Sequence, residues 1–105
     1  MTVKSKPHYL LQAIKAQMTT VNLMYPTISS QDGIRDLGMT MADALAVVQG
    51  LTRNDFEKSM TTNGNYKVWQ DVYKPTWNGI PLYVKFQQAT NNLYYFVISF
   101  KENTE

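Results

Sequence analysis

The chain has 105 residues, a formal net charge of +2, no cysteine and one histidine, His8. This length supports a single domain, residues 1–105, around one hydrophobic core, and the composition excludes disulfides, thiolate metal sites and histidine-pair zinc sites. The sequence has neither the apolar run of about 20 residues that a membrane-spanning helix needs nor a signal peptide at its start, so we expect a cytoplasmic protein without a metal cofactor.

The first part of the chain has helical spacing. Pro7 occupies a plausible first-turn position, and apolar residues recur at helical intervals from Leu10 to Met18. Residues 19–24 are β-prone and predict a short strand. Pro26 ends that strand, because proline restricts the residue before it.

A Thr-x-x-Asp pattern, which is typical of helix starts, occurs twice. The first begins at Thr40 and is followed by an apolar stripe, so it predicts a helix that Gly50 closes. The second begins at Thr52 and predicts a short helix that carries Phe56 and Lys58.

Farther along, helical spacing gives way to the alternation of strands, in three runs at 66–75, 80–88 and 93–101. An Asn-Gly turn signal separates the first two runs, and residues 89–92 separate the last two. The runs predict an antiparallel meander. With the preceding helices, the prediction is an α+β domain in which the helices pack on one face of a mostly antiparallel sheet.

Alternation also predicts which side chains share a face of the sheet. One face would take Leu82, Val84 and Phe86 together with Tyr94, Phe96, Ile98 and Phe100. The less apolar face would take Tyr83, Lys85 and Gln87 together with Tyr95, Val97, Ser99 and Lys101. Tyr83 and Lys101 could therefore lie on one side of neighbouring strands. The run 66–75 has no clearly apolar side, so alternation leaves Gln70 unplaced.

Basic residues concentrate between positions 58 and 85, where the only acidic residue is Asp71. The lysines are Lys58, Lys67, Lys74 and Lys85. Such a stretch can bind the phosphates of RNA, and tryptophan and tyrosine rings can stack on unpaired bases. A solvated lysine face is, however, ordinary in small domains.

Four sequence blocks follow one another in the second half: GLTRNDFEKSMTT (50–62), WQDVYKP (69–75), LYVK (82–85) and ISFKE (98–102). With these blocks the chain resembles the MqsR family of toxin ribonucleases, the mRNA-cleaving halves of bacterial toxin-antitoxin pairs. The likeness extends from KPH near the start to SFKE. It is loose over residues 19–40, and the last hairpin is a few residues longer than is usual in the family.

The resemblance implies a RelE-like fold, ribosome-independent cleavage of mRNA at short GC-containing motifs, and inhibition of translation. It also implies neutralisation by an MqsA-like antitoxin. Antitoxins of this kind bind zinc and DNA themselves, so the toxin would meet DNA only through its partner and would need no membrane.

The resemblance also implies a catalytic site, which carries over to Lys58, Gln70, Tyr83 and Lys101 in the blocks DFEKSM, WQD, YVK and SFK. The two lysines would clamp phosphate, and one of them could act as acid or base. Tyr83 would position or protonate the substrate, and Gln70 would hold phosphate or base. We add Lys85 as a phosphate contact, because it lies one pleat from Tyr83.

These residue types suit a ribonuclease that uses the 2′-hydroxyl of RNA as its nucleophile. That reaction needs a proton acceptor, positive charge for the phosphorane and a donor for the leaving oxygen. Free lysine and tyrosine titrate at about 10, so much of the rate would come from electrostatics and positioning. Each candidate also has an ordinary structural alternative, such as helix-dipole complementation, half-buried packing or protection of a sheet edge.

Three other residues are left outside the predicted site. His8 reads as a surface or capping residue, whereas Asp71 and Trp69 read as structural, with the tryptophan anchored in the core. A competing hypothesis is a catalytically inactive module that binds RNA or an antitoxin and acts in transcriptional autoregulation. A third, a structural interaction protein, leaves the four blocks unexplained.

Overall fold

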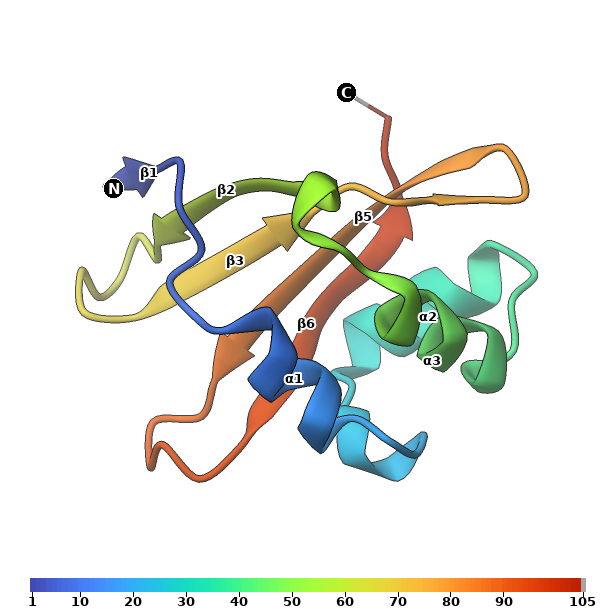
Figure 1. Cartoon of the computed structure of the whole chain (residues 1–105), viewed down its shortest axis with the longest axis horizontal. Helices are drawn as coiled ribbons and strands as arrows, with labels where there is room; N and C mark the ends of the chain where they lie inside the picture. The colour runs from blue at the N-terminus through green and yellow to red at the C-terminus, as the bar shows by residue number, and fades with distance from the viewer. Residues whose placement is uncertain (105) are drawn as a thin grey trace.

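The computed structural model describes residues 1–104 and shows three helices packed on an antiparallel sheet (Figure 1). The helices are α1 (Leu11–Gln17), α2 (Ile28–Asp36) and α3 (Met41–Gly50), with 3₁₀ turns η1 (Asn22–Met24) and η2 (Arg53–Asp55). The strands are β1 (Val3–Lys4), β2 (Phe56–Thr61), β3 (Trp69–Tyr73), β4 (Thr76–Trp77), β5 (Ile80–Gln88) and β6 (Tyr95–Glu102). The predicted α+β class is confirmed, and the arrangement is consistent with a RelE-like fold.

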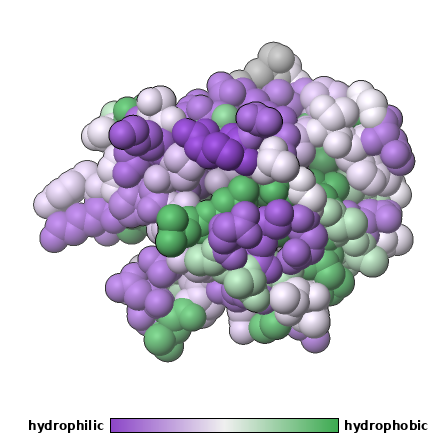
Figure 2. Space-filling view, viewed as in Figure 1, coloured by the Kyte–Doolittle hydropathy of each residue, from purple (hydrophilic) through white to green (hydrophobic). Residues whose placement is uncertain are grey.

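The sheet has the order β1-β2-β3-β5-β6, with the short β4 folded back on the start of β5. All its pairings are antiparallel. Figure 1 views the sheet with α1 and α3 in front of it, and Figure 2 shows the same side with hydrophobic surface near its middle between hydrophilic groups. No helix within residues 1–104 is long and apolar enough to cross a membrane.

The core lies between the helices and one face of the sheet. The sheet contributes fully buried Tyr73, Leu82, Val84, Phe86, Val97 and Phe100, and the helices contribute Ile14, Ile34, Ala44 and Val48. Burying one large apolar side chain is worth about 1.5–3 kcal/mol, so this layer fixes which face of the sheet is covered. The opposite face is left for other roles.

The predicted helix after Thr40 is confirmed, including its end at Gly50. The Thr40 hydroxyl accepts from the Asp43 N–H at 3.0 Å, and the Asp43 carboxylate accepts from the Thr40 N–H at 2.9 Å. This reciprocal capping box satisfies two backbone donors that the helix leaves unpaired. The predicted N-terminal helix is also present, although it begins at Leu11 and not at Pro7.

Helix α2 was not predicted, and it covers the outer edge of β6. The Thr27 N–H donates to the Val97 carbonyl at 3.1 Å, and the Ser30 hydroxyl donates to the same oxygen at 3.2 Å. Gly33 permits the close approach, because a Cβ at this position would lie 1.9 Å from the Phe100 carbonyl oxygen. The edge of β6 is therefore closed to pairing with another strand.

The strand predicted at 19–24 is wrong, because η1 occupies this segment. Successive i→i+3 bonds form it, from Leu23 N–H to Thr20 and from Met24 N–H to Val21. The Gln17 side chain donates to the Tyr95 carbonyl and accepts from the Tyr95 N–H, both at 2.7 Å. It thereby takes the backbone groups at the start of β6 that an added strand would need.

The short helix predicted to carry Phe56 and Lys58 is also wrong. Thr52 and Asp55 do form a capping box, but it opens only the single turn η2, and β2 begins immediately afterwards at Phe56. Residues 56–61 pair with β3, with a shift of register between Phe56 and Lys58, so sheet pairing overrides the helix signal. Lys58 therefore projects from a strand.

The predicted face of β6 is correct at one end of the strand and wrong at the other. Lys85 pairs with Ser99 but Phe86 pairs with Val97, so Ile98 is an extra residue in β6, a β-bulge. Beyond the bulge the alternation is reversed. Val97 is fully buried in the core, and Phe96, predicted to face the core, projects from the opposite side of the sheet.

Candidate active site

Strand register brings the five predicted site residues to the face of the sheet that the helices leave uncovered. Residues paired directly across an antiparallel sheet project from the same face. One row across β2, β3, β5 and β6 consists of Lys58, Val72, Lys85 and Ser99. The row on one side contains Met60, Gln70, Gln87 and Phe96, and the row on the other side contains Tyr83 and Lys101. We call this surface the site face; it is the far face in Figure 1.

The ammonium groups of two lysines lie near the Tyr83 ring. Lys101 Nζ is 5.2 Å from the centroid of the phenol ring, and Lys85 Nζ is 5.8 Å from it. Tyr83 as a whole is only 9% exposed, so neighbouring atoms pack around it. Both distances are within cation–π range, in which the ring face attracts the cations. A packed phenol therefore holds two flexible lysine side chains together.

The electrostatics of Lys85 indicate that the three site lysines are close enough to interact. The pKa of Lys85 is lowered, first by burial and then by the positive charges of Lys101 and Lys58. Both causes disfavour the charged ammonium group. The site face thus presents a local excess of positive charge to which an anion such as a phosphodiester would bind.

Gln70, which alternation could not place, lies on the site face and is 9% exposed. Its Nε2 donates to Gln87 Oε1 at 2.8 Å, across the pair that joins β3 and β5. Gln87 was not among the predicted site residues. Its position two residues after Lys85 was the available signal, since residues two apart on a strand share a face.

Asp71 lies next to Gln70 in sequence but on the core side of the sheet, where it is fully buried. Its carboxylate accepts from the Ser59 hydroxyl at 2.5 Å, from the Tyr9 N–H at 2.9 Å and from the His8 N–H at 3.2 Å. These bonds tie the N-terminal segment to β2 and β3. The prediction that Asp71 is structural agrees with this geometry.

His8 and Trp69 also belong to the N-terminal junction. Their rings are stacked with centroids 5.0 Å apart, and Lys4 Nζ lies 4.1 Å from the Trp69 ring centroid. Burial and the charge of Lys4 lower the pKa of His8. Trp69 packs against the core, as predicted, and by strand alternation it lies on the face opposite Gln70.

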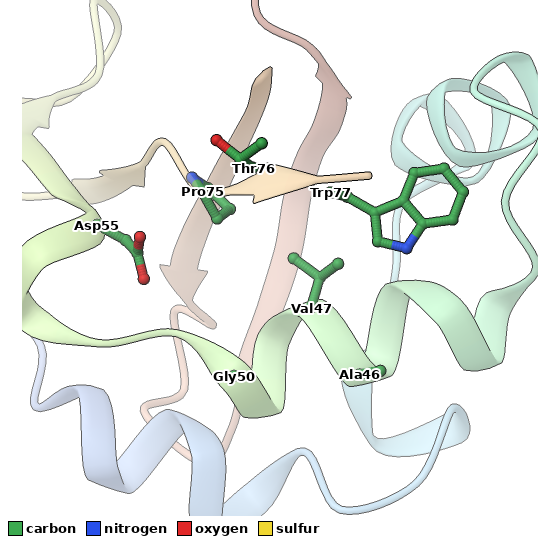
Figure 3. Close-up of a pocket in the computed structure, with 7 residues that line it drawn as sticks. All are labelled: Ala46, Val47, Gly50, Asp55, Pro75, Thr76 and Trp77. Carbon is green, nitrogen blue, oxygen red and sulfur yellow. The ribbon is translucent and has the colours of Figure 1, made fainter. Parts of the chain in front are cut away.

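The main concavities lie away from the site face. Figure 3 shows a pocket between α3 and β4, with Val47 below Pro75, the Trp77 ring to the right and Asp55 to the left. None of the five candidate residues lines this pocket or the other principal pockets of residues 1–104. The site face is an open surface, which suits an extended polymer better than an enclosed small molecule.

No group of three or more His, Asp or Glu side chains within residues 1–104 is arranged to hold a metal ion. The candidate residues instead supply two kinds of group: lysine ammoniums, which bind phosphate, and the phenol and amides, which can donate or accept hydrogen bonds. This combination can hold a phosphodiester and move protons at it.

Two comparisons with known proteins agree with the resemblance noted in the sequence. A family model described as "Motility quorum-sensing regulator, toxin of MqsA" matches residues 6–102. The "mRNA interferase toxin MqsR" of Escherichia coli (strain K12) is 32% identical over 99 residues, which cover 94% of this chain and 97% of the relative.

Proposed function

The chain belongs to the family of motility quorum-sensing regulator toxins, and on this premise we propose that it is the toxin of a toxin-antitoxin pair and cleaves mRNA as an endoribonuclease. The observation that carries the proposal is the site face, where Lys58, Gln70, Tyr83 and Lys101 gather around Lys85. Cleavage at GC-containing motifs, inhibition of translation and neutralisation by an MqsA-like antitoxin belong to the same proposal.

In the proposed reaction the 2′-oxygen attacks the adjacent phosphorus as its proton passes to a base on the site face. The bond from phosphorus to the 5′-oxygen breaks, and a proton donor converts the leaving oxygen into a 5′-hydroxyl. The other product end is a 2′,3′-cyclic phosphate. Lys58 and Lys101 stabilise the charge on the phosphorane, Tyr83 positions the phosphate, and Gln70 holds the RNA beside it.

Lys85 is the best candidate for the proton acceptor. Its lowered pKa makes its neutral amine more accessible than that of an ordinary lysine. The residue thus has two roles in the proposal: as an ammonium group it attracts the phosphate, and as an amine it takes the 2′-hydroxyl proton. Tyr83, beside both Lys85 and Lys101, is placed to return a proton to the leaving oxygen.

Cleavage is expected to persist in EDTA and to require the 2′-hydroxyl at the cut position. The test uses purified protein freed of antitoxin and one defined single-stranded RNA, with and without EDTA. A matched oligonucleotide carries a single 2′-deoxy nucleotide at the cut. Loss of activity in EDTA that magnesium restores, or normal cleavage of the deoxy substrate, would contradict the proposed chemistry.

Replacing Lys101 with methionine is expected to raise the pKa of Lys85 toward its ordinary value, because one of the charges that lowers it is removed. A ¹³C-lysine NMR titration of the folded protein measures the change, with Lys67→Met as the control. Because Lys85 has a lower pKa in the folded protein than in the unfolded chain, the unfolded state binds more protons between these two pKa values. The free energy of unfolding therefore rises with pH in this alkaline range. An unchanged Lys85 pKa in Lys101→Met would refute the coupling.

The alternative function is the catalytically inactive module that grips RNA or the antitoxin. The lysines and the open sheet serve binding as well as they serve chemistry. The two functions differ in the cleavage assay: an inactive module retains bound RNA intact, whereas the proposed enzyme produces fragments with defined ends.

A further inference from the structure

Three aromatic side chains gather outside the core, beside the site face. The ring centroids of Tyr25 and Tyr94 are 4.5 Å apart, and those of Tyr94 and Phe96 are 6.3 Å apart. None of the three belongs to the core cluster or to the side chains packed against it, and Tyr25 is 44% exposed. We call these residues the aromatic platform. Their position calls for an explanation other than core packing.

Tyr25 of the aromatic platform has an energetically unfavourable backbone conformation. Tyr25 has φ of 43° in the left-handed region, where a bulky side chain is rare and where glycine usually ends a helical turn. In this conformation the Tyr25 ring contacts the Tyr94 ring. Strain of this kind concentrates at functional sites, so the residue that carries it is a candidate for a functional role.

The bulge at Ile98 places the platform in line with the proposed active site. It turns Phe96 onto the site face, where Phe96 pairs directly with Gln87, and Gln87 accepts the hydrogen bond from Gln70. Lys85 lies two residues before Gln87, or about 7 Å along the strand at about 3.4 Å per residue. The platform therefore adjoins the lysines of the site face, since Phe96 lies opposite the next residue after Lys85 on the same face of β5.

We propose that the aromatic platform and the Gln70–Gln87 pair form a nucleobase-binding subsite for the nucleotide next to the cleaved phosphate of single-stranded RNA. This inference rests on the proposed function. Aromatic rings stack on unpaired bases. The Gln70 carbonyl oxygen and the Gln87 amide hydrogens can pair with the edge of a base while their mutual bond is kept. The neighbouring lysines favour a polyanion over a neutral peptide as the occupant.

Binding of an uncleavable RNA tests the subsite. The probe is a 2′-O-methyl oligonucleotide with the sequence that the wild-type protein cuts, in versions with a single abasic position. Phe96→Leu and Tyr94→Leu remove a ring but keep apolar volume, and Tyr66→Leu, at an exposed loop tyrosine, is the control. We expect the two platform variants to bind roughly tenfold more weakly, within the range for one base-aromatic stack, and the control to bind normally.

The abasic series makes the test specific to a base. At one position near the cut, loss of the base should weaken binding to the wild type but add little to the defect of Phe96→Leu, since the two changes remove the same contact. Thermal unfolding of each variant checks the fold. A 5-iodouridine placed at that position of the RNA should photo-cross-link to Tyr25, Tyr94 or Phe96 of the wild-type protein. This test needs no substitution in the protein.

Each contrary outcome has its own meaning. If the wild type cuts RNA while both variants bind normally and no cross-link reaches the platform, the subsite is refuted and the proposed function stands. If the wild type neither binds nor cuts RNA, both are refuted. If the variants weaken binding only to an MqsA-like antitoxin, the platform is a protein-docking surface and the nucleobase subsite is refuted.

Discussion

Lys101→Ala is expected to lower the single-turnover rate of RNA cleavage about 100-fold or more, as removal of a donor that stabilises transition-state charge typically does. Lys101 is exposed, pairs with Tyr83 across β5 and β6, and places its ammonium group 5.2 Å from the Tyr83 ring centroid. The substitution removes a positive charge that would stabilise the negatively charged phosphorane, and it does not disturb the core. The thermal unfolding midpoint should therefore change little.

Lys67→Ala is the matched control, because it removes one positive charge from the loop before β3, beside a pocket that none of the five site residues lines. It should weaken RNA binding only slightly, through general phosphate attraction, and should cleave at nearly the wild-type rate. In cells, Lys101→Ala should abolish growth arrest, as should Lys58→Ala. A Lys101→Ala rate equal to that of Lys67→Ala would remove Lys101 from the site.

Asp71→Ala should have the largest effect on stability, lowering the free energy of unfolding by about 3 kcal/mol or more, because each buried group left without its partner costs about 1–3 kcal/mol. The substitution would leave the Ser59 hydroxyl and the Tyr9 and His8 N–H groups without this acceptor. Total stabilities of domains are only about 5–15 kcal/mol, so a large fraction would be lost. Denaturant unfolding of the purified protein measures it.

Two further variants serve as controls for the Asp71→Ala result. Asp71→Asn keeps one side-chain acceptor and should lie between the wild type and Asp71→Ala. Asp36→Ala removes an exposed carboxylate from the last residue of α2, where a negative charge opposes the helix dipole, and should be neutral or slightly stabilising. If Asp71→Ala and Asp36→Ala unfolded at the same denaturant concentration, the buried carboxylate would have no structural role.

Much of the fold could be predicted from local signals. The capping box at Thr40, the turn after Trp77 and the alternation in residues 80–88 each involve a few neighbouring residues, so the sequence carries them directly. The strand at β2 could not be predicted in the same way. Its helix-start signal is real, but it lasts one turn, and pairing with β3 then decides the conformation.

The bulge at Ile98 shows where strand alternation fails as a predictor. A single inserted residue reverses the face of every residue beyond it, and nothing in the local pattern marks the insertion. The predicted grouping of Tyr83 with Lys101 is correct because both lie on the same side of the bulge. The assignment of Phe96 to the core is wrong because Phe96 lies beyond it.

The candidate site depended on a different source of information. Residues on four strands cannot be grouped from one sequence without their register, and Gln70 was unplaced until β3 was aligned with β5. The family resemblance named Lys58, Gln70, Tyr83 and Lys101, and the register brings them to one face. Gln87 and Tyr25 lie outside the matched motif residues, so only their contacts in the folded chain draw attention to them.

The chemistry of the fragment ends tests the central claim most directly. One defined RNA is incubated in EDTA with antitoxin-free protein, and the products are analysed by mass spectrometry, beside Lys101→Ala. We expect specific fragments with 2′,3′-cyclic phosphate and 5′-hydroxyl ends from the wild type and almost none from the variant. Fragments with 3′-hydroxyl and 5′-phosphate ends, or equal cleavage by Lys101→Ala, would contradict a lysine-based site that uses the 2′-hydroxyl as its nucleophile.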